Sequence, residues 1–398
     1  MKAKLAKRIA DLPEYVFGRL NATKLARRRE GIDIIDLGMG NPSDPTPEPI
    51  VEKLIEVARQ PRNHRYSVSA DGIANLKRSV AAFYDREYGV ELDPETEVIC
   101  TIGSKEGISH LSLALVDHGD TVIVPVPAFP PHLYSVAFAG GRFVNVPVGD
   151  TPEFFDRLDD LVPTIEPKPK MLILNFPHNP TALTVEPPYF ERAVEFGRRH
   201  DIVIMHDFAY SHVTFDGYRA PSLLQAPGAK DVGVEFSTLS KSFNMAGWRV
   251  GFCVGNRDIV QALARVKGYY DYGLFMPVQI AAIIALRDCA DHVARQAAIY
   301  QERRDVLCRG LAQYGWDVPS PRGSMFVWAP LPEPLRAMGS VEFCTMLLNE
   351  ANVAIAPGSA FGAAGDGFVR MAIVEKKQRL QQAVRQIGRA LRAHCPTP

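Results

Sequence analysis

Seven short apolar segments, rich in β-branched residues, alternate with helical patterns between about residues 95 and 255. They are VICTIG, TVIVPVP, FVNVPV, KMLILNF, DIVIMHDF, VEFSTLS and RVGFCVG. Continuous apolar runs of this length are typical of strands buried on both faces of a largely parallel sheet. The alternation with helices predicts an α/β fold, and ligand sites of such folds lie at the carboxyl ends of the strands.

A second group of elements follows this region. Residues 281–314 predict one long connecting helix. The apolar runs MFVWAPL, VAIAPG and FVRMAIV then alternate with helical segments near 341–351 and 376–393. The pattern predicts a second, smaller α/β unit, as expected for a chain of 398 residues, which is too long for one compact core.

We expect three parts along the chain: an N-terminal arm at 1–45, a large domain at 46–285 and a small C-terminal domain at 286–398. The segment GNPSDPTPEP (40–49) predicts an extended loop between the arm and the large domain, because each proline disfavours helix before it. The first twenty residues are basic and amphipathic, but Asp11 and Glu14 come early and no apolar core follows. We therefore interpret them as a docking arm and not as a targeting peptide.

Composition limits the partners of this chain. Lys plus Arg and Asp plus Glu number 45 each, so no bulk charge attracts nucleic acid or an anionic membrane. The longest apolar stretches, such as 171–176, are far shorter than the roughly 20 residues that span a bilayer. The six cysteines lack CxxC spacing, which favours structural thiols in a reducing cytoplasm. We expect no metal cofactor.

The segment TLSKSFNMAGWRVGF (238–252) follows a predicted strand and contains several side chains that can take part in catalysis. It combines hydroxyls with a lysine at 241 and an arginine at 249. A lysine at a strand end is usually a solvated side chain. A lysine amine is also what an enzyme dependent on pyridoxal 5′-phosphate (PLP) needs to form an imine with the cofactor.

Such an enzyme also needs an acid beside the pyridine nitrogen, and Asp207 ends the predicted strand in DIVIMHDFAY. Tyr210, three residues later, and Asn179 in NFPHNPT could both reach the O3′ atom of the ring. Taken singly, Asp207 could equally be a helix N-cap and Asn179 a turn residue before Pro180.

An anion site is indicated by TIGSKEG (101–107), where a glycine separates a strand from a helix opened by Ser104 and Lys105. Free amides and the helix dipole favour a phosphate at such a position. Ordinary helix capping by Ser104 and Glu106 is the alternative. Three residues of the lysine segment could complete the phosphate site from the other side: Thr238, Ser240 and Arg249.

Two further residues could contact the ring or the substrate. Phe129 in VPVPAFPPH lies on a proline-braced turn and could stack on the pyridine, although a core position is equally compatible with the sequence. Arg370 lies within the apolar run FVRMAIV, where an unpaired guanidinium would be costly. Its fork suits an amino-acid α-carboxylate, with a structural salt bridge as the alternative.

In this order, GSKEG, PAFP, NFPHNPT, HDFAY, TLSKSFNMAGWRVGF and the late FVR resemble the fold-type I, class I/II PLP-dependent aminotransferases over nearly the whole chain. More narrowly, DIIDLGMGNPSDPTP, RYSVSADGI, TIGSKEGISHL and RAPSLLQAPGAKDVGVEF resemble the bacterial glutamate:pyruvate (alanine) aminotransferases. These are close kin of the LL-diaminopimelate aminotransferases. The resemblance implies a large domain with a mostly parallel sheet, a smaller α/β domain and an arm that packs on the small domain and the partner subunit.

The resemblance also implies residue roles. Lys241 would be the Schiff-base lysine and proton shuttle, Asp207 would meet the pyridine nitrogen, and Tyr210 and Asn179 would meet O3′. Phosphate contacts would come from Ser104, Lys105, Thr238, Ser240 and Arg249, and from Tyr66 of the partner subunit. Arg370, Asn179 and the backbone near Gly40 would bind the substrate carboxylate. The family is homodimeric, so an obligate dimer in the cytoplasm is expected.

Two positions depart from the family pattern. Phe129 stands where many relatives carry tyrosine, and His178 stands where a small polar residue is common. The anchor for a distal substrate carboxylate stays open, with Arg65, Arg19 and His178 as candidates.

We expect a ping-pong transamination, with L-alanine and 2-oxoglutarate giving pyruvate and L-glutamate. LL-diaminopimelate or aspartate aminotransfer is the alternative. A PLP-dependent C–S lyase and a non-catalytic PLP-binding regulator are further alternatives. A nucleotide-binding Rossmann protein is disfavoured because no GxGxxG follows a strand.

Overall fold

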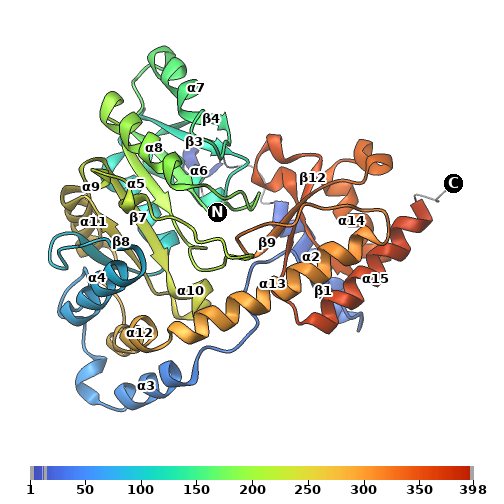
Figure 1. Ribbon diagram of the computed structural model, residues 1–398, viewed down its shortest axis with the longest axis horizontal. Coiled ribbons are helices and arrows are strands. Elements are labelled where there is room, and N and C mark those ends of the chain that lie inside the picture. The colour runs from blue at the N-terminus through green and yellow to red at the C-terminus, as the bar shows by residue number, and fades with distance from the viewer. Residues whose placement is uncertain (1–3, 11, 13–15, 395–398) are drawn as a thin grey trace.

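The computed structural model describes residues 4–10, 12 and 16–394 (Figure 1). Its largest sheet has the strand order β2-β8-β7-β6-β5-β3-β4. The strands are β2 (Val98–Thr101), β3 (Thr121–Val126), β4 (Arg142–Pro147), β5 (Met171–Asn175), β6 (Val203–Asp207), β7 (Gly233–Thr238) and β8 (Gly251–Gly255). These are the seven apolar segments of the sequence, so the predicted α/β fold is confirmed.

The sheet is mostly parallel, but β8 runs antiparallel to both β2 and β7. The expectation that every strand is buried on both faces is wrong for β4, most of whose residues are exposed or half-buried. The reason is its position: β4 is an edge strand that pairs only with β3 in this sheet.

Helices cover both faces of this sheet and create two separate cores. One core involves α3 (Glu48–Ala58), α4 (Ala74–Tyr88), α7 (Phe154–Leu161), α8 (Pro187–His200) and α12 (Met276–Asp288). The other involves α5 (Ser104–Leu115), α6 (Pro130–Ala139) and α11 (Arg257–Tyr270). Two short helices, α9 (Ala229–Val232) and α10 (Leu239–Ser242), flank β7. The result is a three-layer α/β unit.

A second unit surrounds a three-stranded antiparallel sheet of order β11-β12-β9 (Figure 1). Its strands are β9 (Phe326–Pro330), β11 (Ala356–Pro357) and β12 (Phe368–Ala372), and its helices are α13 (Ala290–Ala312), α14 (Ser340–Glu350) and α15 (Lys377–His394). Strand β1 (Ile35–Asp36) pairs in parallel with β10 (Val353–Ala354). Apolar residues from both ends of the chain therefore share this core.

The N-terminal part contributes α1 (Lys7–Ala10) and α2 (Val16–Arg29). The 3-10 helices are η1 (Pro61–His64), η2 (Val162–Thr164), η3 (Leu223–Gln225), η4 (Ala246–Trp248), η5 (Glu333–Met338), η6 (Gly358–Phe361) and η7 (Ala363–Gly365). No helix in the described part of the chain is long and apolar enough to cross a membrane.

Three predicted elements differ from the structure. The single helix expected at 281–314 is wrong: it is two helices, α12 and α13, separated at Cys289, whose backbone leaves the helical conformation. The run VAIAPG forms two short strands instead of one. The proline-rich loop ends two residues earlier than expected, because α3 begins at Glu48 and tolerates Pro49 in its first turn.

Candidate active site

A cavity of about 540 Å³ lies between the large sheet and the small unit. It is lined by all the predicted site residues except Tyr66: Gly40, Ser104, Lys105, Phe129, Asn179, Asp207, Tyr210, Thr238, Ser240, Lys241, Arg249 and Arg370. These residues span more than 300 positions of sequence, so the fold alone brings them together.

The large sheet explains this convergence. Strands β5, β6 and β7 are parallel neighbours, with Asn175 paired to Asp207 and Asp207 paired to Phe236. The carboxyl ends of these strands therefore meet at one edge of the sheet. The last residue of each of these strands is polar, and Lys241 lies in α10, which begins where β7 ends.

Lys241 is held inside the cavity by one hydrogen bond, in which Nζ donates to the carbonyl of Gly40 at 2.7 Å. Burial lowers the pKa of the Lys241 ammonium to about 8, with repulsion from Arg370 and Arg249 adding to the effect and Asp207 opposing it. Near physiological pH a minority of this amine is therefore neutral and nucleophilic, a far larger share than for a lysine with an ordinary pKa.

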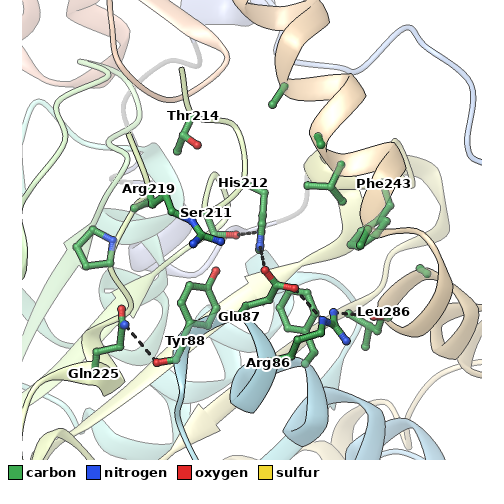
Figure 2. A pocket seen from close by; sticks show the side chains of 18 of the residues that line it. Arg86, Glu87, Tyr88, Ser211, His212, Thr214, Arg219, Gln225, Phe243 and Leu286 are labelled. Atoms are coloured by element: carbon green, nitrogen blue, oxygen red, sulfur yellow. Dashed lines mark hydrogen bonds and ion pairs between the residues drawn. The ribbon is translucent and has the colours of Figure 1, made fainter. Parts of the chain in front are cut away.

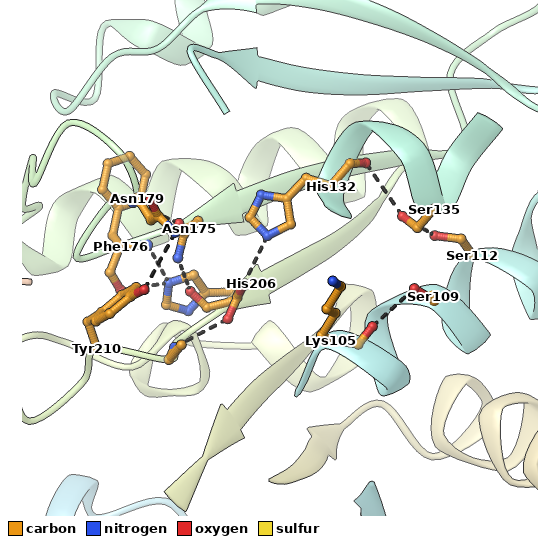
Figure 3. A network of polar contacts seen from close by, with 12 residues as sticks. Lys105, Ser109, Ser112, His132, Ser135, Asn175, Phe176, Asn179, His206 and Tyr210 are labelled. Carbon is orange, nitrogen blue, oxygen red and sulfur yellow. Dashed lines mark hydrogen bonds and ion pairs between the residues drawn. The ribbon is translucent and has the colours of Figure 1, made fainter. Parts of the chain in front are cut away.

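Asp207 is buried and accepts a hydrogen bond from His132, whose Nε2 lies 2.9 Å from Oδ2 (Figure 3). The amide of Ala209 donates to the other carboxylate oxygen at 3.3 Å, and the side chain of Asn175 donates to the carbonyl of Asp207 at 2.6 Å. Both carboxylate oxygens are therefore oriented. His132 comes from α6, 75 residues earlier, and nothing in the local sequence singled it out.

Asn179, Tyr210 and Arg370 form a second group of contacts. Arg370 Nη1 donates to Oδ1 of Asn179 at 2.7 Å, and the amide nitrogen of Asn179 lies 3.5 Å from the Tyr210 hydroxyl. Burial raises the pKa of Tyr210, so the phenol stays protonated and remains a donor. The three side chains together form a fixed set of donors facing one side of the cavity.

Arg370 extends from β12 and lies between two aromatic rings. Its guanidinium carbon is 3.9 Å from the ring centroid of Phe326 and 4.5 Å from that of Phe361. Nη2 donates to the carbonyl of Gly38 at 3.0 Å. These contacts hold the guanidinium at the cavity wall, where a carboxylate would meet a planar, preorganised fork.

The first turn of α5 faces the same cavity from the opposite side. The leading amides of a helix have no partner within that helix, and they point toward the space near Ser104 and Lys105. A Cβ atom at Gly103 would lie only 2.4 Å from Nη2 of Arg249, so glycine is needed for this guanidinium to lie beside the helix. The arrangement is a cradle for an anion.

Thr238 and Ser240 complete the cradle and are tied to each other. Thr238 Oγ1 accepts from the amide of Ser240 at 3.2 Å and donates to the carbonyl of Val250 at 2.9 Å. Phe129 lines the wall beside them, with its ring edge-on to that of His132 at a centroid distance of 5.5 Å.

Sequence reasoning missed two residues that line the cavity, Lys24 and Asp36. Lys24 Nζ donates to Asp36 Oδ2 at 2.6 Å, and Asp36 Oδ1 accepts from the amide of Gly38 at 3.0 Å. Lys24 is only 8% exposed, which marks the pair as built into the site. The positions of Lys24 and Asp36 in the N-terminal arm gave no indication of this role.

Two of the three predicted candidates for a distal anchor, Arg65 and His178, do not line this cavity. Arg65 is exposed, and His178 is buried with Nδ1 bound to the Thr181 hydroxyl at 2.7 Å. Burial lowers the pKa of His178 to about 3, so it carries no charge for a carboxylate. The side chain of Arg19 lies outside the described residues. Tyr66 is 88% exposed and does not line the cavity of its own chain.

One group in the described chain could resemble a metal site: Glu106, His110 and Asp271. The ammonium of Lys267 lies 3.1 Å from Glu106 Oε1 and 3.0 Å from Asp271 Oδ1. It already supplies the positive charge that these carboxylates need, so the group is an ion-pair network.

Several of the solved structures that this chain resembles are named as aminotransferases. The substrate-bound BacF structure from Bacillus subtilis has a TM-score of 0.92 and 34% identity, covering 98% of each chain. An aspartate aminotransferase double mutant from Thermus thermophilus has a TM-score of 0.89 and 29% identity, covering 98% of this chain and all of that one. The fold and the site therefore define an aminotransferase.

The family described as aminotransferase class I and II matches residues 32–387, and the chain belongs to it. Glutamate-pyruvate aminotransferase AlaC of Escherichia coli K12 is 52% identical over 97% of this chain and 93% of its own length. LL-diaminopimelate aminotransferase of Moorella thermoacetica is 42% identical over 97% and 98%. The protein is thus an aminotransferase that acts on amino acids and 2-oxo acids, and its family uses PLP.

The residues of the cavity fit this cofactor. The cradle at α5 and Arg249 suits a phosphate, and the Gly103 backbone leaves the space that a Cβ would fill. Lys241 offers an amine with a lowered pKa, and the buried carboxylate of Asp207 ends the neighbouring strand. An amine, a carboxylate and an anion site are the donor set that PLP requires.

Proposed function

We propose that this aminotransferase transfers the amino group of L-alanine to 2-oxoglutarate, which yields pyruvate and L-glutamate. The observation that carries the proposal is one cavity in which the Lys241 amine, the Asp207 carboxylate and the Arg370 guanidinium meet. The choice of substrates is supported by the 52% identity with the glutamate-pyruvate enzyme over almost the full chain.

Lys241 is the catalytic lysine in this proposal. The chemistry supplied by bound PLP is an aldehyde that condenses with amines and a protonated ring that withdraws electrons from the α-carbon. Nζ of Lys241 would hold the cofactor and, when free, would take the proton from the α-carbon of the substrate. An amine with a pKa of about 8 is suited to both accepting and returning that proton near neutral pH.

Asp207 keeps a proton on the pyridine nitrogen. Its carboxylate is fixed by His132 on one oxygen and by the Ala209 amide on the other, which favours a stable ion pair with the ring. Tyr210 and Asn179 would donate to O3′, and Phe129 would pack against the ring. Ser104, Lys105, Thr238, Ser240 and Arg249 bind the phosphate.

The substrate α-carboxylate binds to Arg370 and Asn179, with the backbone at Gly40 beside them. In the structure the Asn179 amide oxygen and the Gly38 carbonyl already orient the guanidinium, so the side chain loses little conformational freedom when the carboxylate binds. Neutralising this charge would draw the small unit toward the large sheet and exclude water from the reacting atoms. The two substrates bind in turn, as in a ping-pong mechanism.

We also propose that the active unit is a homodimer. Exposed aromatic rings adjoin one another on the large unit: Tyr66 (88% exposed) lies 6.1 Å from Tyr272, and Tyr270 (70%) lies 5.1 Å from His110, between ring centroids. Exposed aromatic side chains grouped in this way support an interface that a second subunit covers. Tyr66 of the partner subunit would then reach the phosphate.

The proposal also includes the domain division of the chain and its cellular compartment. The chain divides into an arm at 1–45, a large domain at 46–285 and a small domain at 286–398, with β1 of the arm docked on the small unit. The cytoplasm is its compartment, since the five described cysteines are buried free thiols.

A panel of amino donors tests the substrate assignment. Purified holoenzyme is assayed with L-alanine, L-glutamate, L-aspartate and LL-diaminopimelate against pyruvate and 2-oxoglutarate. We expect kcat/KM for alanine with 2-oxoglutarate to exceed that for LL-diaminopimelate by about 100-fold or more, the discrimination a dedicated pocket achieves. A higher kcat/KM for LL-diaminopimelate or aspartate would overturn the assignment.

The same protein distinguishes transamination from the alternatives on this fold. Addition of alanine without acceptor converts one cofactor per chain to pyridoxamine 5′-phosphate, whereas a C–S lyase or a regulator leaves it unchanged. Lys241→Ala is the control, because borohydride traps the cofactor on the wild-type side chain and not on the variant.

A further inference from the structure

A second cavity, of about 480 Å³, shares no lining residue with the catalytic one (Figure 2). It lies between α4, the segment 211–225 that follows β6, and the junction of α12 with α13. Ser211 and His212 form part of its wall, and they come directly after Tyr210 of the catalytic cavity.

The charge in this cavity is positive. Glu87 accepts from Arg86 Nε at 2.9 Å, so these two charges offset each other. The guanidinium of Arg219 and the hydroxyl of Thr214 also line the cavity, and neither has a hydrogen bond or ion pair within the described chain. An anion would therefore find one uncompensated cation and one unused hydroxyl donor.

His212 does not change this balance at neutral pH. Burial lowers the pKa of His212 to about 4; Glu87 opposes the shift, and Arg219 and Arg86 add to it. The neutral ring is held by Ser211, whose hydroxyl lies 2.8 Å from Nδ1, while Nε2 faces Glu87 at 4.0 Å.

Most of the remaining wall is apolar, although Tyr88 and Gln225 also line it. The side chains of Phe83, Phe243, Leu286 and Val293 line it together with three alanines of α13. An inorganic anion would leave this surface in contact with water, whereas an aliphatic chain would cover it. The ligand that fits the cavity has a negative end and a short hydrocarbon end.

We propose that this cavity is a binding site for a small aliphatic monocarboxylate, with the carboxylate on Arg219 and Thr214 and the chain against α13. Nothing in the transamination chemistry uses these residues. The site is therefore distinct from the substrate carboxylate site at Arg370.

The cavity is also linked to the catalytic machinery through its walls. Beyond His212, Asp216 accepts from Arg304 of α13 at 3.0 Å, and its amide donates to Gln301 of the same helix at 3.1 Å. The loop that carries Tyr210 is thus fastened to the helix that leads into the small unit. A ligand wedged between α4 and these two elements opposes their movement against the large sheet, and so lowers turnover.

Isothermal titration calorimetry tests the binding. Holoenzyme is first saturated with aminooxyacetate, a carboxylate that condenses with the cofactor aldehyde and fills the catalytic cavity. Hexanoate is then the probe and uncharged hexanamide its control. We expect one hexanoate per chain, and binding by hexanamide at least about tenfold weaker.

Variants test whether the heat of hexanoate binding comes from this cavity. Arg219→Gln should weaken hexanoate binding at least about tenfold, and Ala294→Phe, an exposed position on the apolar wall, should abolish it by filling the space. Arg309→Gln removes an equal charge from helix α13, at a side chain 80% exposed and outside the cavity, and should leave binding unchanged. The absence of saturable binding, or equal affinity in all variants, would overturn the site.

Kinetics test the link to turnover. At saturating amino donor and acceptor, hexanoate should lower kcat of the wild type at least about twofold and leave Arg219→Gln unaffected. Arg219→Gln should retain the basal kcat, because Arg219 touches no part of the catalytic cavity. Inhibition of equal size in both proteins, or none in the wild type, would overturn the link.

Discussion

Lys241 shows how a single side chain obtains its reactivity from its surroundings. The free energy of the charged ammonium is raised by burial and by two guanidinium groups, and only Asp207 offsets it. The hydrogen bond to the Gly40 carbonyl positions Nζ without adding a counter-charge. The amine is therefore made basic enough to take a proton and weak enough to lose one.

This arrangement makes the stability of the cofactor-free protein depend on pH. The folded pKa of Lys241, about 8, is below its ordinary value of 10.5, so between these pH values the unfolded chain binds more protons. The free energy of unfolding should therefore rise as pH increases from 8 to 10.5. The contribution is at most about 3 kcal/mol, since a tenfold change in proton affinity corresponds to about 1.4 kcal/mol.

Urea unfolding of the apoprotein at pH 7, 8, 9 and 10 measures this effect. Lys241→Met keeps the volume of the side chain and removes the charge, so the pH slope should become smaller and the variant should be more stable at pH 7. An identical slope in the two proteins would show that Lys241 titrates normally.

At the scale of elements, the ion pair between Lys24 and Asp36 connects the arm to the catalytic cavity. Lys24 of α2 binds Asp36, Asp36 binds the amide of Gly38, and the Gly38 carbonyl receives Arg370. The adjacent loop is tightly packed, because a Cβ at Gly40 would lie 2.5 Å from the Phe326 ring. The arm thus supports the residue that we propose binds the substrate carboxylate.

Breaking this pair should affect substrate binding more than chemistry. Lys24→Met leaves Asp36 without its counter-ion and frees the loop that holds Arg370. We expect KM for the amino donor to rise about tenfold, the equivalent of about 1.4 kcal/mol, with kcat within about threefold of wild type. Steady-state kinetics measure both quantities.

Arg29→Met is the matched control for this prediction. Arg29 is an exposed cation on the same helix α2, away from the cavity lining. Its substitution should leave KM unchanged. Equal KM values for Lys24→Met and the wild type would show that the ion pair does not support the carboxylate site.

At the scale of the whole molecule, the large unit exposes more aromatic and apolar surface than is usual for a chain that stays monomeric. Tyr66, Val68 and Tyr269 are each at least 80% exposed. Such surface is normally covered, and a two-fold interface would cover it on both subunits at once.

Placing a charge in this surface should prevent assembly. Tyr269→Asp changes a side chain that is 89% exposed, so the folded chain should tolerate it while an apolar interface would not. We expect sedimentation at the mass of a single 44.0 kDa chain and loss of most activity. Ile299→Asp, at a side chain 37% exposed on α13, should remain dimeric and active. Unchanged sedimentation of Tyr269→Asp would place the interface elsewhere.

The sequence by itself determined the strands of the large sheet and the residues that follow them. Buried strands are local runs of apolar, β-branched residues, and the carboxyl edge of such a sheet is a fixed consequence of its topology. Lys241, Asp207 and Asn179 could be placed at one edge for this reason. The family resemblance supplied their expected roles.

Only the tertiary structure decided the features that depend on distant contacts. No glycine or proline marks the break at Cys289; α12 packs on α3 and α4, whereas α13 turns away to pack on α15 (Figure 1). His132 meets Asp207 across 75 residues, and the buried Lys24 of α2 pairs with Asp36 of β1, the strand that docks on β10. These distant contacts depend on how the elements pack, which no local pattern of residues encodes.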